Sequence, residues 1–211
     1  MAKRRKARRA RRRNGDHRVH RLPKIQIIFA DSYDEAFHTA KEKRWTHKAL
    51  VSGKRYARLL RKAIKPNLKR FLVTAEEVSG LGWKLPRIRC YVVHDVPYDF
   101  DDPVTFMIRP LNKMQIAVET VFHELTHQLV AQNNDRLNKK NYVAKKYAKE
   151  TMDVKDHIFD QAIMQKIYEK IYGLRRTKKI VRTYWPWEGH WRAWQIIRKE
   201  GADRIIKAYT K

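Results

Sequence analysis

The stretch VFHELTHQLV, residues 121–130, places two histidines and a glutamate inside an otherwise apolar run. His123 and His127 are four residues apart, so on an α-helix they project from the same face, about one turn apart. At about 100° per residue, the apolar side chains fall on the roughly opposite side of the helix. These are Val118, Val121, Phe122, Leu125 and Leu129. The pattern predicts a helix with a core stripe and, apart from it, a pair of potential metal ligands.

The spacing of the two histidines suits a zinc ion. Two imidazoles on one helical face can both reach one Zn²⁺ at roughly 2.0–2.1 Å. Glu124 follows the first histidine, where its carboxylate can take a proton from a zinc-activated water and pass it to a leaving amine. H-E-x-x-H is the metalloprotease pattern. We therefore predict His123 and His127 as zinc ligands and Glu124 as the catalytic base.

The flanking sequence alternates between strand and helix patterns. Alternating apolar residues predict strands over 24–30, 87–95 and 104–110. Helical spacing marks 32–44 and 53–78, with Pro66 as a break or kink in the second.

After Pro110 the pattern becomes helical. Asn112 and Gln115 have the spacing of a capping box, and this helix should run to about Gln132. A second helix is expected from 152 to 172, with Gly173 as its stop, and a third within 191–209.

With this order of elements, the sequence resembles the zincin metallopeptidases over residues 100–172, in particular minimal zincins of the archaeal and bacterial kind. The resemblance implies an α+β fold: a small sheet of three to four strands, the HExxH helix packed across it, a following helix with the third ligand, and a C-terminal helix. It also implies that strand 104–110 is the sheet edge and pairs with extended substrate. Residues 23–211 would form this single domain.

A catalytic zinc needs three protein ligands and an open position. His157 is the best third ligand, because it lies early in the next helix, off the stripe formed by Ile163, Ile167 and Ile171. Asp156 and Asp160 are rivals, since their D-x-x-x-D spacing resembles the E-x-x-x-D helix of gluzincins. His190 is another, because its segment is similar to the third-ligand segment of SprT-like proteases. The metzincin extension is absent.

Acidic residues close to these histidines can fix their tautomers. Asp156, Asp160 and Glu119 are the carboxylates that could accept an imidazole proton in this way.

Charge points to a polyanionic partner. The chain has 49 Lys and Arg against 22 acidic residues, a net charge of +27. Residues 1–22 carry eleven basic residues and one acidic residue, which predicts a disordered arm that binds nucleic acid phosphates. Without them the body still carries about +17. Neither a membrane span nor a signal peptide is recognisable, so we expect a cytoplasmic protein and no membrane partner.

Two other features favour ordinary packing. Cys90 lies in an alternating strand pattern and is expected to be a small buried residue. Four of the six tryptophans lie between 185 and 194, where core packing is a simpler explanation than stacking on bases.

Two functions fit the sequence. The first is a zinc-dependent endopeptidase that hydrolyses a protein or peptide substrate near nucleic acid, with His123, His127 and His157 holding zinc and Glu124 activating water. The second is a basic nucleic-acid-binding protein on a zincin scaffold whose metal is structural or lost, for example with a fourth protein ligand closing the site.

Overall fold

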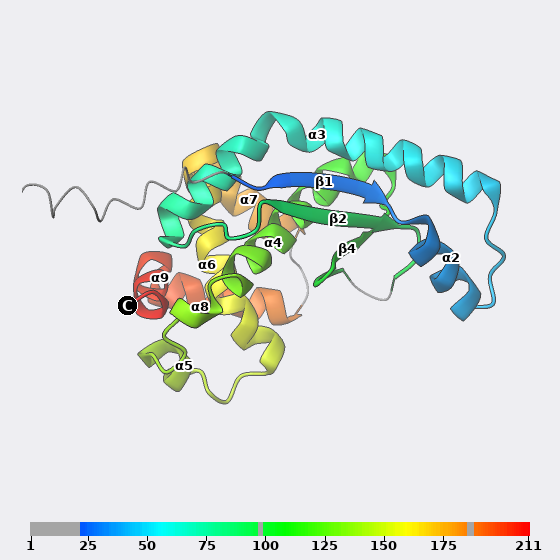
Figure 1. Ribbon diagram of the computed structural model, residues 1–211. Coiled ribbons are helices and arrows are strands. Elements are labelled where there is room, and N and C mark those ends of the chain that lie inside the picture. Colours follow the sequence, from blue (N-terminus) through cyan, green and yellow to red (C-terminus); the bar gives the residue numbers. More distant parts are fainter. Residues whose placement is uncertain (1–21, 97–98, 185–187) are drawn as a thin grey trace, which may run out of the picture.

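The computed structural model describes residues 22–96, 99–184 and 188–211, so the basic arm predicted over residues 1–22 lies outside it except for Leu22. The described chain is a mixed α+β fold in which helices predominate (Figure 1). The strands are β1 (Lys24–Phe29), β2 (Arg87–Val93), β3 (Phe100–Asp101) and β4 (Val104–Met107). The α-helices are α2 (Asp31–Ala40), α3 (His47–Ser79), α4 (Met114–Ala131), α5 (Tyr142–Lys146), α6 (Met152–Tyr172), α7 (Leu174–Tyr184), α8 (Glu188–Glu200) and α9 (Ala202–Tyr209).

The four strands form one sheet in the order β1-β2-β4-β3, which agrees with the expected three to four strands. The three strands placed from the sequence are present as β1, β2 and β4, whereas β3 was not predicted. β1, β2 and β4 are parallel, and only β3 runs antiparallel to its neighbour. β4 therefore has a partner on each side, and the sheet ends at the two-residue β3. The expectation that strand 104–110 is the free edge was wrong, because the chain turns back before β4 and pairs with it.

One face of the sheet packs against helices. The alternation in β1 and β2 turns Ile27, Cys90 and Val92 inward, where they are buried, while Arg87 and Arg89 are exposed. The buried position expected for Cys90 is confirmed. α3 lies along β1 (Figure 1). It approaches so closely at Gly53 that a Cβ there would overlap the ring of Phe29.

α4 packs against α3 and α6, which also contact each other, and against β3 and β4. Phe71 of α3 stacks on Phe122 of α4 with ring centroids 4.3 Å apart. One turn further along α4, Thr126 donates a hydrogen bond to the sulfur of Met164 in α6. Because α4 has neighbours all round, its polar residues are buried together with its apolar stripe.

Several predicted boundaries need correction. Pro66 does not end α3, which runs through it for 33 residues from a Thr46 cap that accepts a hydrogen bond from Ala49. The Asn112–Gln115 capping box is absent, because a 3₁₀ turn over Leu111–Lys113 delays the start of α4. The C-terminal helix is two helices, α8 and α9, divided at Gly201 with φ 85°. Short α5 and basic α7 were not predicted, whereas α6 and its Gly173 stop were.

No helix in the described part of the chain has the length and apolar character needed to cross a membrane.

The Phe71–Phe122 stack should hold α4 in place. Replacing Phe71, which is fully buried, by alanine should lower the free energy of unfolding by about 3–5 kcal/mol, measured by denaturant titration. Leu174→Ala is the control, because Leu174 is 63% exposed and its removal should change stability by about 0.5 kcal/mol at most. A decrease below about 1 kcal/mol for Phe71→Ala would show that this stack does not anchor α4.

Candidate metal centre

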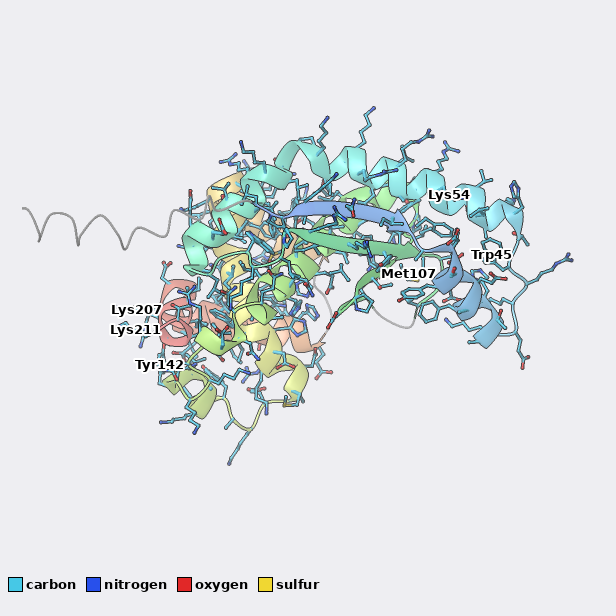
Figure 2. All side chains as sticks on the ribbon, in the orientation of Figure 1. Trp45, Lys54, Met107, Tyr142, Lys207 and Lys211 are labelled. Carbon is cyan, nitrogen blue, oxygen red and sulfur yellow. The ribbon has the colours of Figure 1, made fainter. Side chains whose placement is uncertain are left out.

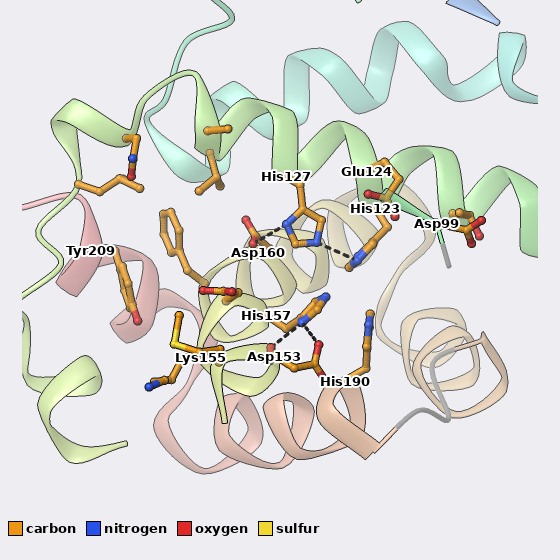
Figure 3. A pocket seen from close by; sticks show the side chains of 18 of the residues that line it. Asp99, His123, Glu124, His127, Asp153, Lys155, His157, Asp160, His190 and Tyr209 are labelled. Carbon is orange, nitrogen blue, oxygen red and sulfur yellow. Dashed lines mark hydrogen bonds and ion pairs between the residues drawn. The ribbon is translucent and has the colours of Figure 1, made fainter. Parts of the chain in front are cut away.

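Four histidines from three helices gather at one point (Figure 3). α4 supplies His123 and His127, α6 supplies His157, and α8 supplies His190. The ligating nitrogens of His123, His157 and His190 all lie within 4.8 Å of one another, so these three could hold a metal ion. His127 joins them through His123, since the two Nε2 atoms are 2.9 Å apart.

The two α4 histidines have nearly the separation that one ion requires. Two nitrogens bound to a tetrahedral ion at roughly 2.0–2.1 Å would be about 3.4 Å apart. The observed 2.9 Å between the Nε2 atoms of His123 and His127 is slightly shorter. Both rings are held by the regular helix, so the predicted one-turn spacing is what directs the two Nε2 atoms to the same place.

Asp160 of α6 orients His127. Its Oδ2 is 2.9 Å from His127 Nδ1, and the carboxylate side chain is almost fully buried. A carboxylate accepts the proton on Nδ1, which leaves the Nε2 lone pair of a neutral His127 directed at the cluster. Asp160 thus has the accepting role proposed for it from the sequence, and it is not itself a member of the ligand group.

His157 is oriented by Asp153, one turn earlier in α6. The Nδ1 atom lies 2.6 Å from the main-chain oxygen of Asp153 and 3.1 Å from its carboxylate. A carbonyl oxygen can only accept, so Nδ1 carries the proton and Nε2 presents its lone pair. Sequence reasoning missed this role of Asp153, although the i, i+4 spacing of the two residues could have suggested it.

His190 reaches the cluster because α8 begins beside the start of α6. Gly189 allows this approach, since a Cβ at this position would overlap the carboxylate of Asp153. The His190 ring lies against that of His157, with centroids 3.8 Å apart and the ring planes tilted by 40°. Its Nδ1 is 2.9 Å from the side-chain amide nitrogen of Gln161, an interaction that the sequence did not indicate.

Burial favours the neutral form of His123, His157 and His190. Burial lowers the pKa of His123 well below its usual value, and the neighbouring histidines lower it further. Burial is also the main cause of the lowered pKa of His157, and with His157 and His127 it lowers the pKa of His190 to about 3. A neutral imidazole is the form that binds a metal, so these three rings are in the ligating state at neutral pH.

The two other carboxylates considered from the sequence lie elsewhere. Glu119 is fully buried and accepts a hydrogen bond from Gln115 at 2.6 Å, and burial raises its pKa. It contacts no histidine among the described interactions, so the tautomer-fixing role considered for it was wrong. Asp156 is exposed and lines the cleft near the cluster without an interaction to a histidine in the described part of the chain.

A cleft of about 1080 Å³ leads to the histidines. Glu124 is buried and lines this cleft beside His123 (Figure 3). Burial of Cys90 is the main cause that raises the pKa of its thiol to about 12, and the charge of Glu124 raises it further. Cys90 therefore stays protonated and offers no thiolate ligand. The arrangement places a carboxylate, four imidazoles and space for a ligand in one cavity.

The wall of the cleft at β4 is closed by Asp99. Its Oδ1 accepts a hydrogen bond from the main-chain nitrogen of Met107 at 2.8 Å, and its Oδ2 pairs with Arg109. All three residues line the cleft. An extended peptide that paired with β4 here would have to displace Asp99 from the Met107 amide.

No family model matches the chain, and no match is found among curated proteins or among solved structures.

The Asp160–His127 pair gives a direct test of this geometry. Asp160→Asn keeps the shape of the side chain but removes its charge, so zinc affinity, measured by competition with a chromophoric chelator, should fall by about 10- to 100-fold. Asp156→Asn, one turn earlier on the same helix, is the matched control and should leave the affinity unchanged. Equal affinities for the two variants would mean that Asp160 does not support the metal site.

Proposed function

We propose that the chain is a zinc-dependent endopeptidase of the zincin type. The observation that carries this proposal is the single cleft that contains His123, His127, His157 and the buried Glu124. The fold brings His123 and His157 together although they are 34 positions apart in the sequence. The substrate of the enzyme would be a protein or peptide, and the basic arm would bring the enzyme to nucleic acid.

His123, His127 and His157 would hold the zinc. Imidazoles that share one tetrahedral ion have ring centroids about 5 Å apart. The centroid distances are 4.5 Å for His123–His127, 5.3 Å for His123–His157 and 5.1 Å for His127–His157. The 3.8 Å between His157 and His190 is shorter than this, so the two rings would have to move apart before both could bind one ion. Nitrogen separations alone favour the group with His190 in place of His127. We prefer the set with His127, because Asp160 also fixes its tautomer.

The chemistry divides between the ion and Glu124. Zinc, when bound, would make a water molecule more acidic and withdraw electron density from the peptide carbonyl. Glu124 would take the proton from that water and then deliver it to the amine that leaves. Asp160 and Asp153 would keep the lone pairs of His127 and His157 directed at the ion throughout.

A second function is favoured by the position of His190. Its nitrogen lies within 4.8 Å of those of His123 and His157, so it could close the position that a catalytic zinc leaves open. A site with four protein ligands is structural. The chain would then be a basic nucleic-acid-binding protein in which the metal stabilises the fold.

Glu124→Gln separates the two functions. Under the first, cleavage of fluorescein-labelled casein should fall by roughly 10²- to 10⁴-fold while zinc content stays that of the wild type. Glu77→Gln, an exposed glutamate of α3, is the matched control and should keep full activity. Cleavage that survives in Glu124→Gln would contradict the assigned base, and a wild type that binds zinc but cleaves no peptide bond would favour the second function.

A further inference from the structure

The positive charge of the folded body is concentrated in two helical segments. The body carries about +17 once the eleven basic residues and one acidic residue of residues 1–22 are left out of the +27 total. Residues 47–70 of α3 contain nine Lys and Arg and no acidic residue, and α7 contains five and none. These two segments therefore contribute +14 to the net charge of about +17, and the rest of the body contributes about +3.

On α3 the charges form a continuous stripe. Lys54, Arg58, Lys62, Lys65 and Lys69 follow one another at intervals of three or four residues, and all are exposed. The opposite side of α3 is buried in the core through Tyr56, Leu60 and Ile64. Figure 2 shows side chains along α3 pointing away from the sheet. The stripe extends over sixteen residues, from Lys54 to Lys69, and is therefore about 22 Å long.

These charges are not neutralised within the described part of the chain. The ion pairs described there involve none of the five stripe residues. A double-stranded nucleic acid has about one phosphate charge per 1.7 Å of its axis, so a 22 Å stripe faces roughly a dozen of them. Lysine and arginine side chains that neutralise these phosphates release the counterions condensed on the duplex, which favours binding.

The stripe continues onto α6 and the start of α7. Arg70 donates a hydrogen bond to the main-chain oxygen of Lys170 at 2.8 Å. The guanidinium of Arg176 lies 4.4 Å from the centroid of the Tyr172 ring at the end of α6. A shallow hollow between α3 and α6 is lined by Lys69, Arg70 and Lys170, and its acidic residue, Glu77, is paired with Lys170.

The surface of α3 lacks the features by which proteins bind single-stranded nucleic acid or a membrane. Single-stranded nucleic acid binds largely by stacking bases on exposed aromatic rings, and the aromatic residues of α3, Tyr56 and Phe71, are buried. A membrane-surface helix inserts an apolar face beside its charges, and that face of α3 is occupied by the core.

We propose that the exposed stripe of α3, with Arg70, Lys170 and Arg176, binds the phosphate backbone of double-stranded nucleic acid without reading its sequence. This inference rests on the nucleic-acid part of the proposed function but needs neither zinc nor peptide cleavage. No residue of α3 lines the cleft, so a duplex on this surface leaves the cleft free for a protein.

Duplex binding of the full chain tests the proposal. In the test variant the five stripe residues, Lys54, Arg58, Lys62, Lys65 and Lys69, are changed to glutamine. In the control variant four exposed lysines and one exposed arginine on the other helices and loops are changed to glutamine, namely Lys140, Lys145, Lys149, Arg198 and Lys207. Fluorescence anisotropy with a labelled 20-base-pair DNA is measured over a series of salt concentrations, and circular dichroism checks that both variants fold.

The test variant should bind at least about tenfold more weakly than the control variant, and its log–log salt dependence should be shallower by about 0.9 for each phosphate that the variant no longer neutralises. Equal affinity and slope for the two variants would overturn the α3 surface while leaving the arm as the binding site. A wild type that binds no duplex would contradict the nucleic-acid part of the proposed function itself. Weaker binding to phosphatidylserine vesicles with unchanged DNA binding would reassign the surface to membranes.

Discussion

The structure depends on how α4 is enclosed. α3 contacts it through the Phe71–Phe122 stack, and α6 contacts it one turn further along through Thr126 and Met164. Because neither neighbour can move without opening the core, the α4 face with His123 and His127 is fixed opposite the start of α6. The packing of apolar residues thus sets the distance between imidazoles that are far apart in the sequence. Protein interiors pack densely enough to hold such distances.

Four imidazoles meet in one cluster, in which His123 is buried and the other three are partly buried. Burial lowers the pKa of three of them, so the cluster avoids charge repulsion by staying unprotonated. Asp160 and Asp153 then direct the lone pairs of His127 and His157 toward the same point. A metal ion could bind several of these nitrogens at once, so their convergence marks the cluster as a candidate metal centre.

Much of the arrangement could be predicted from local patterns. The strands, α6 and the one-turn spacing of His123 and His127 follow from periodicity that extends over a few residues. The contribution of His190 could not be predicted in this way, because it depends on α8 beginning beside α6 and on Gly189 fitting against Asp153. The strand β3 at the edge of the sheet was missed for a different reason, because a strand of two residues has no periodicity to detect. The third ligand is the feature that spacing alone leaves open, because it depends on long-range packing.

In the proposed site one zinc ion is held by His123, His127 and His157. We would measure the metal content of the purified wild type beside His157→Ala and His190→Ala by elemental analysis. Close to one zinc per chain is expected in the wild type and in His190→Ala, and loss of the zinc is expected in His157→Ala. Loss in His190→Ala alone would make His190 the third ligand instead, and a wild type that stays free of metal after zinc is supplied would contradict the metal centre.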